Sequence, residues 1–293
     1  MTDRMPLDRA ARWGAAELAR AGVASPAVDA EVLLAHALGL GLPELRRARL
    51  MGEAVDEAGQ TAYRDLVGRR AARVPLQHLT GRAHLAGVDL AVGPGVFVPR
   101  AETEVLVGLA LAELQGLRSP LVLDLCTGSG AIALAMAAAR PDARVGAVEL
   151  SAEAFRYAEA NVAASGLGMD LRLGPAQSAF PELTGQVDVV TCNPPYIPPD
   201  AVPVDVEVRE HDPELALYGG GADGLDVPRE MAAWALRLLR PGGLLLMEHA
   251  DSQGEELPAA LRARGFVEVA DHADLSGRPR VSSGRAPAQP SSR

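Results

Sequence analysis

From Pro120 onward, the chain alternates between short apolar runs and longer segments with helical spacing. Strands are predicted in LVLDLC, ARVGAVEL, DLRLG, VDVVTC and GGLLLMEH, and helices in GAIALAMAAA, SAEAFRYAEANVAAS and PREMAAWALRLLR. This alternation indicates an α/β fold with a mostly parallel, doubly wound sheet. Such sheets bind ligands beyond the carboxyl ends of their strands, so polar residues that follow a strand are the candidates for function.

The rest of the chain divides into further regions. Residues 1–80 carry three helical patterns, the third over 54–73, and predict a small helical bundle that docks onto or recognises a partner. Residues 81–100 hold short apolar alternations separated by glycine and predict a β-hairpin linker. The α/β domain is expected over 101–281. The tail 282–293 is rich in Gly, Pro, Ser and Arg and is predicted to be disordered.

Composition and charge narrow the class of protein. The 293 residues include 48% hydrophobic residues and carry a formal net charge of −10, which disfavours the basic face of a nucleic-acid-binding protein. Two cysteines, Cys126 and Cys192, form neither a disulfide framework nor a metal cluster, so no metal is expected. The sequence shows no signal-type N-terminus and no apolar run of membrane-spanning length, so we expect a cytoplasmic protein without a membrane partner.

The loop after the first predicted strand of the sheet has the composition of a cofactor loop. In LDLCTGSGAIALA, Asp124 precedes two glycines that lie between a strand and a helix. Glycine lets the backbone approach a ligand, and a helix start offers free N–H groups. The G-x-G-x-x-G fingerprint of NAD-binding proteins is incomplete here, which leaves NAD possible, but an acid ahead of G-x-G fits class I methyltransferases better. The expected cofactor-binding residues are Asp124, Cys126, Thr127, Gly128, Ser129 and Gly130.

A second acid, Glu149, ends the next predicted strand. A carboxylate at this place in a nucleotide-binding βαβ unit accepts hydrogen bonds from both hydroxyls of a ribose. A single acid at a strand end is often only solvated. Its separation from the glycine loop makes ribose binding the favoured interpretation.

The fourth strand of the sheet ends on the rigid sequence NPPYIPP. Proline lacks a backbone donor and fixes φ, so the strand stops at Asn193. The side-chain oxygen of Asn193 and the carbonyl of Pro194 are two acceptors that match the two hydrogens of an NH₂ group. Tyr196 adds a ring that packs against a planar group or hydrogen-bonds it. We predict that Asn193, Pro194, Pro195 and Tyr196 bind substrate, that Asn193, Pro194 and Tyr196 act in catalysis, and that Asn193 also lies at the cofactor.

This pattern suits a planar nitrogen that bears two hydrogens, as in a carboxamide or the exocyclic amine of adenine or cytosine. The lone pair of such a nitrogen is delocalised, so fixed acceptors orient it and stabilise the positive charge that it gains as it attacks a sulfonium methyl group. Placement in line at about 3 Å supplies most of the rate. A proline-rich turn that only ends a strand would explain NPPY by itself. It would not explain why NPPY occurs in the same sheet as the glycine loop and Glu149.

These motifs together resemble N-methyltransferases that depend on S-adenosylmethionine, a group that includes DNA and RNA adenine methyltransferases. Segments 75–107 and 207–230, with LLRPGGLLLMEHADSQG, are similar more narrowly to the peptide chain release factor glutamine methyltransferases. That resemblance covers nearly all of residues 7–281. It implies a class I methyltransferase fold and methylation of the glutamine side-chain amide in the Gly-Gly-Gln loop of class I release factors. It also implies that the helical domain grips the release factor and that Phe97 lines the aliphatic stem of the glutamine.

Other interpretations remain open at this point. The alternative substrate is an adenine or cytosine amine in nucleic acid, which requires a basic groove. A non-catalytic cofactor-binding protein would be expected to lack Asn193 or a loop glycine, and a dehydrogenase leaves NPPY unexplained. The chain also departs from the family pattern at Ala101, at Cys126 where glycine is usual, and at Pro175 where many relatives have an acid near the adenine. If their strands are neighbours, the thiols of Cys126 and Cys192 lie close together, and oxidation is expected to inactivate the protein.

Overall fold

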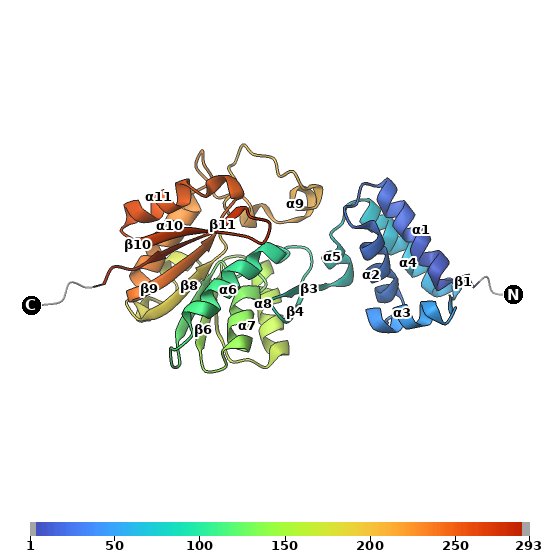
Figure 1. Cartoon of the computed structure of the whole chain (residues 1–293), viewed down its shortest axis with the longest axis horizontal. Helices are drawn as coiled ribbons and strands as arrows, with labels where there is room; N and C mark the ends of the chain where they lie inside the picture. Colours follow the sequence, from blue (N-terminus) through green and yellow to red (C-terminus); the bar gives the residue numbers. More distant parts are fainter. Residues whose placement is uncertain (1–3, 289–293) are drawn as a thin grey trace, which may run out of the picture. The chain divides into compact units, whose positions relative to one another are not determined.

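The computed structural model describes residues 4–288, which form two compact units (Figure 1). The helical unit contains the chain up to Arg82 together with Val204–His211. The sheet unit contains Ala83–Pro203 and the chain from Asp212 onward. The short segment Val204–His211 is therefore separated in sequence from the rest of its unit, which the sequence patterns do not reveal.

The helical unit is a bundle around an apolar core that includes Leu18, Leu33, Leu34 and Tyr63. The Tyr63 hydroxyl donates a hydrogen bond to the Ala30 carbonyl at 3.2 Å. A Cβ at Gly14 would lie 1.9 Å from that hydroxyl, so only glycine lets the first helix pack here. Its elements are β1 (Met5–Pro6), α1 (Leu7–Arg20), α2 (Pro26–Ala37), α3 (Leu42–Leu50), β2 (Ala54–Val55), α4 (Glu57–Ala71), α5 (Leu76–Thr80) and α9 (Val206–His211).

Two helices of this unit differ from the expectation. The helix predicted over 54–73 begins at Glu57, because the Asp56 side chain accepts a hydrogen bond from the Gly59 N–H at 2.9 Å and caps it. Helix α3 has no counterpart among the predicted helices. Its nine residues, LPELRRARL, bury only Leu45 and Ala48, so its helical periodicity is weak.

The sheet unit contains a seven-stranded sheet in the order β10-β11-β9-β8-β5-β6-β7. Strands β5 to β9 pair in parallel, and β11 pairs antiparallel with both β9 and β10. This confirms the predicted mostly parallel α/β sheet. The strands are β5 (Leu121–Leu125), β6 (Arg144–Glu149), β7 (Asp170–Leu173), β8 (Val187–Cys192), β9 (Leu239–Glu248), β10 (Val267–Ala273) and β11 (Pro279–Arg285).

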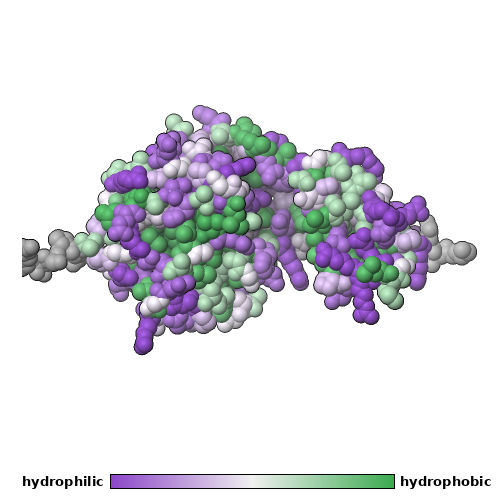
Figure 2. Space-filling view, in the orientation of Figure 1, coloured by the Kyte–Doolittle hydropathy of each residue, from purple (hydrophilic) through white to green (hydrophobic). Residues whose placement is uncertain are grey.

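Helices cover both faces of this sheet, each over its own apolar core. Helices α6 (Glu104–Glu113), α7 (Ala131–Ala139) and α8 (Ala152–Ser165) contribute to one core. Helices α10 (Asp226–Leu238) and α11 (Glu256–Arg264) contribute to the other. Helix α6 has no charged residue between its terminal glutamates, and hydrophobic side chains gather over it in Figure 2.

At its two ends, the sheet unit confirms the predicted hairpin and contradicts part of the predicted disordered tail. Strands β3 (Arg82–Leu85) and β4 (Val88–Ala91) pair in a small two-stranded sheet within the predicted linker. The prediction of a disordered tail from residue 282 is wrong for its first part, because residues 282–285 lie in β11 and pair with β9. The polar composition misled the prediction: Ser282 and Ser283 are buried although their side chains are polar. Residues 289–293 lie outside the described part.

Candidate active site

The three predicted motifs lie at one edge of the sheet. In the parallel register, Leu125 of β5 pairs with Val148 of β6 on one side and with Cys192 of β8 on the other. The glycine loop, Glu149 and the NPPY segment each begin at or just beyond these residues. The structure therefore brings the cofactor loop, the second acid and the tetrapeptide together at the carboxyl ends of neighbouring strands.

The glycine loop has a left-handed backbone at three positions, with φ of 59° at Cys126, 59° at Gly128 and 84° at Gly130. The Thr127 N–H donates to the Val148 carbonyl at 3.0 Å, and the Gly130 N–H donates to the Thr127 carbonyl at 2.9 Å. A Cβ at Gly128 would meet no atom within 4 Å, so the space beside the loop is open. The loop thus fits a ligand that approaches the backbone closely, as the sequence predicts.

Asp124 lies beneath this loop and is fully buried. Its two oxygens accept hydrogen bonds from the Thr127 hydroxyl at 2.6 Å and from the Thr191 hydroxyl at 2.7 Å. Burial raises the pKa of Asp124 to about 6, although both hydroxyls oppose the shift. These contacts make Asp124 a brace between the loop and β8, and its predicted cofactor contact stays a prediction. The part played by Thr191 was not anticipated.

Glu149 also holds the loop, from the neighbouring strand. One carboxylate oxygen accepts the Gly128 N–H at 2.8 Å and the other accepts the Ser151 N–H at 2.7 Å. Burial raises the pKa of Glu149, and the N–H groups of Ser151 and Gly128 partly offset that effect. Each oxygen keeps a second lone pair, so the carboxylate is still able to accept hydrogen bonds from ribose hydroxyls.

Asn161 of α8 fixes the glycine loop at Ser129. The sequence analysis did not identify it as a site residue. Its amide nitrogen donates to the Ser129 carbonyl at 2.9 Å and to the Ala91 carbonyl at 3.0 Å, and its oxygen accepts the Ala91 N–H at 2.7 Å. The side chain is buried. The only signal for it was a single amide residue in an alanine-rich helix.

The two proposed acceptors follow β8 directly. Asn193 is partly exposed and Pro194 is buried. Among residues 4–288, none forms a hydrogen bond with the Asn193 side chain or with the Pro194 carbonyl. Both oxygens are therefore free to accept hydrogen bonds from a ligand.

The backbone of the tetrapeptide is fixed by the segment that follows it. The N–H groups of Tyr196 and Ile197 donate to the Leu217 carbonyl at 3.1 and 2.8 Å, and the Gly219 N–H donates to the Ile197 carbonyl at 3.0 Å. Gly224 has φ of +75°, and a Cβ there would lie 2.2 Å from the Tyr196 carbonyl oxygen. The glycine-rich sequence YGGGADG packs against the NPPY backbone where a side chain would collide with it.

Gln253, in the short 3₁₀ helix η5 (Asp251–Gln253), adds a further clamp that the sequence did not suggest. Its amide nitrogen donates to the carbonyls of Tyr196 and Asp223, each at 2.8 Å. Its oxygen accepts the Ala250 N–H at 3.0 Å. The buried side chain thus joins the tetrapeptide, the glycine-rich segment and the end of β9.

The Tyr196 hydroxyl is oriented by Glu248. It donates to one Glu248 oxygen at 3.4 Å, and the Thr103 hydroxyl donates to the other at 2.7 Å. Burial, and then the negative charge of Glu248, raise the pKa of Tyr196, and burial raises the pKa of Glu248. The tyrosine therefore stays a neutral phenol at physiological pH, and its ring, more than its hydroxyl, is available to a substrate.

Phe97 lies between the buried residues Val96 and Val98, with its own side chain partly exposed. The Arg100 guanidinium lies over its ring, 5.3 Å from the centroid, and donates to Asp212 at 2.8 Å. The partial exposure is compatible with a substrate contact. A role in holding the stem of a glutamine stays a prediction.

The two cysteines are free thiols. The Cys126 sulfur lies 3.8 Å from the Met231 sulfur. Burial, and then the neighbouring Cys126 thiol, raise the pKa of Cys192. Since the thiolate is the reactive form, this environment makes Cys192 a slow partner in oxidation, and the redox hypothesis stays a prediction.

Residues 4–288 contain neither a metal-binding cluster nor a membrane-spanning helix. No group of three or more His, Cys, Asp or Glu residues in this part of the chain is arranged to hold a metal ion. No helix in the same range is long and apolar enough to cross a membrane.

Comparison with known proteins assigns the chain to a family. The PrmC N-terminal domain matches residues 9–81 and the Methyltransferase small domain matches residues 87–209. The release factor glutamine methyltransferase of Streptomyces coelicolor is 49% identical over 92% of this chain and 94% of its own. The protein of the same name from Bifidobacterium longum is 43% identical over 90% of this chain and 94% of its own.

A further relative bears a different name. The 4-amino-L-phenylalanine/4-methylamino-L-phenylalanine methyltransferase of Streptomyces pristinaespiralis is 46% identical over 68% of this chain and 69% of its own. The Streptomyces coelicolor and Bifidobacterium longum proteins, which extend over nine-tenths of the chain, are both release factor glutamine methyltransferases. This chain therefore belongs to the release factor glutamine methyltransferase family, whose members are class I methyltransferases dependent on S-adenosylmethionine.

Proposed function

We propose that the protein methylates the side-chain amide nitrogen of a glutamine in class I peptide chain release factors, within their Gly-Gly-Gln motif. The observation that carries this proposal is the pair of free acceptors, Asn193 and Pro194, at the sheet edge that also holds the glycine loop and Glu149. Two adjacent acceptors match the two hydrogens of a carboxamide. Because release factors act on ribosomes, we infer that the protein works in the cytoplasm.

The residues around the glycine loop fit S-adenosylmethionine. When bound, this cofactor supplies a methyl group activated by a sulfonium. Glu149 would hold the ribose hydroxyls, and the open space at Gly128 would admit the ligand against the backbone. Asp124 and Asn161 act on the cofactor through the loop, by fixing it from below and from the side.

The tetrapeptide would orient the amide nitrogen and stabilise its developing charge. The hydrogen bonds from its N–H groups to Asn193 and Pro194 strengthen as the nitrogen becomes more positive, so they favour the transition state over the ground state. The surplus proton leaves to water after transfer, which is why no histidine or free carboxylate is needed beside Asn193. Rigid support of the acceptors avoids a reorganisation cost during the reaction.

Two other substrate classes are less well supported. Methylation of adenine or cytosine in nucleic acid is disfavoured by the net charge of −10 and by the match to the PrmC N-terminal domain. An aromatic amine such as 4-amino-L-phenylalanine is a substrate in the name of one relative, but that relative matches only 68% of this chain.

A label-transfer assay distinguishes these classes. The protein is incubated with S-adenosylmethionine carrying a labelled methyl group and, in separate reactions, a class I release factor, 4-amino-L-phenylalanine or duplex DNA. We expect label in the release factor alone, and none in a release factor whose Gly-Gly-Gln glutamine is replaced by alanine. Label in the small amine or the DNA, with an unlabelled release factor, would refute the proposal.

A further inference from the structure

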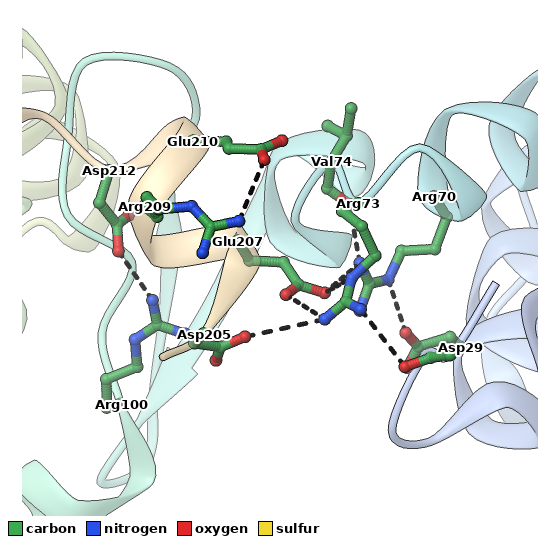
Figure 3. A network of polar contacts seen from close by, with 11 residues as sticks. Asp29, Arg70, Arg73, Val74, Arg100, Asp205, Glu207, Arg209, Glu210 and Asp212 are labelled. Carbon is green, nitrogen blue, oxygen red and sulfur yellow. Dashed lines mark hydrogen bonds and ion pairs between the residues drawn. The ribbon is translucent and has the colours of Figure 1, made fainter. Parts of the chain in front are cut away.

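The segment that follows the tetrapeptide contributes helix α9 to the helical unit, where a buried carboxylate anchors it (Figure 3). One oxygen of Glu207 accepts hydrogen bonds from Arg70 at 2.7 Å and Arg73 at 2.8 Å, and the other accepts one from Arg73 at 2.5 Å. Arg70 also donates to Asp29 at 2.7 Å. Glu207 is thus joined to residues 134 and 137 positions away in the sequence. The network runs from α2 through α4 to α9.

The surroundings make this network more costly to break than a surface ion pair. The side chains of Arg70, Asp29 and Glu207 are each only 9% exposed. Burial alone would raise the pKa of Glu207, but hydrogen bonds from Arg73 and Arg70 outweigh it and hold the pKa well below its usual range. Removal of one partner from such a buried network leaves an unpaired charge, which is far more costly than the loss of an exposed pair.

The chain that carries Glu207 starts and ends at the amide-holding tetrapeptide. It leaves after Tyr196, passes through α9, and returns at Leu217, whose carbonyl accepts the Tyr196 and Ile197 N–H groups. Gly219 closes the loop by donating to the Ile197 carbonyl. The excursion of about twenty residues is therefore fastened to the NPPY backbone at its base and to the helical unit at its tip.

We propose that Glu207 is a positioning residue that couples the helical unit to the tetrapeptide, so that a protein substrate held by the helical unit fixes the acceptors Asn193 and Pro194 in the productive arrangement. This inference rests on the proposed function, because it concerns a protein substrate. It assigns to α9 a role in turnover beyond its contribution to the stability of the helical unit.

The kinetic test uses Glu207→Gln, which removes the charge but keeps the shape. We expect kcat for release factor methylation to fall by tenfold or more, while the Kd values for the release factor and for S-adenosylmethionine stay within threefold. Glu210→Gln is the matched control, since Glu210 lies on the same helix in an exposed pair with Arg209 at 3.4 Å. An unchanged kcat would overturn the proposal. A fall in activity that comes only from a higher KM and a higher Kd for the release factor would overturn it as well.

A second variant guards against misfolding of the first. Arg73→Lys keeps the positive charge and leaves the bond between Arg70 and Glu207, but it loses the two-pronged contact of the guanidinium. We expect an intermediate loss of kcat at a temperature where circular dichroism shows a folded chain. A wild-type kcat in this folded variant would mean that the network only stabilises the fold.

Hydrogen exchange tests the coupling without any activity. In Glu207→Gln we expect faster exchange of the Tyr196, Ile197 and Gly219 amides, which lie outside the helical unit, and no change in Glu210→Gln. Acceleration confined to residues 204–211 would contradict the coupling. If the wild-type protein fails to methylate a release factor, the proposed function is refuted. The exchange measurement needs no activity, so it still tests the coupling in that case.

Discussion

Asn193 and Asp124 are both polar residues at the carboxyl edge of the sheet, but their side chains have opposite surroundings. Both oxygens of Asp124 are engaged by the hydroxyls of Thr127 and Thr191. The amide of Asn193 has no hydrogen-bond partner among residues 4–288. A substitution of Asn193 should therefore act on turnover, and a substitution of Asp124 should act on stability and on the loop.

Asn193→Ala is expected to lower kcat by at least about a hundredfold, which is the usual effect of removing one preorganised hydrogen-bonding group from a transition state. The Kd for S-adenosylmethionine should stay within about threefold, because the cofactor loop is braced by other residues. Steady-state kinetics and calorimetric titration measure the two effects. Asn161→Ala serves as the contrast, because it should weaken cofactor binding. Loss of cofactor binding in Asn193→Ala would assign that residue to the cofactor.

Asp124→Asn should change how stability depends on pH. The pKa of Asp124 is raised from its ordinary value to about 6, so the folded state prefers the protonated form. The contribution to the free energy of unfolding is thus fully present below about pH 4 and is lost as pH rises through 6, a change of roughly 3 kcal/mol. Relative to wild type, Asp124→Asn should gain stability across this interval in urea unfolding. Parallel curves for the two proteins between pH 4 and 7 would contradict the buried, protonated carboxyl.

Cys126 has a left-handed backbone, with φ of 59°, a conformation that suits glycine better than a residue with a side chain. A side chain in this conformation costs about 1–2 kcal/mol relative to glycine. We expect Cys126→Gly to be more stable than Cys126→Ala by about 1 kcal/mol in urea unfolding, since both lose the thiol and only glycine relieves the backbone. Equal stability of the two variants would show that the loop relaxes around this residue.

At the scale of elements, the tetrapeptide depends on the glycine-rich segment that packs against it. Gly224→Ala would place a Cβ 2.2 Å from the Tyr196 carbonyl oxygen and should lower kcat more than tenfold by displacing the acceptors. Gly185→Ala is the matched control, because Gly185 has a similar φ of +71° but no atom within 4 Å of its Cβ position. Both variants carry the strain of a positive φ, and Gly224→Ala should lose more stability in thermal unfolding because its Cβ also collides with backbone. Equal kcat in the two would mean that the packing against Tyr196 does not matter for turnover.

The sequence predicted the elements whose signals are local. The strands from β5 to β9, the glycine loop between β5 and α7 and the rigid NPPY turn follow from periodicity and residue type within a few positions. Contacts over long sequence separations were out of reach, such as Thr191 with Asp124 and Gln253 with Tyr196. Strand β11 was missed because its serines suggested solvent, whereas pairing with β9 buries them.

At the scale of the whole molecule, the chain passes between the two units after Arg82, after Pro203 and after His211. A single crossing at the linker would join the two units at one point of the chain only. The extra pair of crossings, on either side of Glu207, links the helical unit to the loop that holds the amide acceptors. This arrangement suits a protein substrate, which extends over more surface than a free amino acid.

Fragment mass spectrometry of a class I release factor tests the central claim most directly. After incubation with the protein and S-adenosylmethionine, the account predicts a mass gain of one methyl group on the glutamine of the Gly-Gly-Gln motif. The gain should be absent with Asn193→Ala, although that variant still binds the cofactor. An unmodified glutamine with the active wild-type protein, or a methyl group on another residue, would contradict the account.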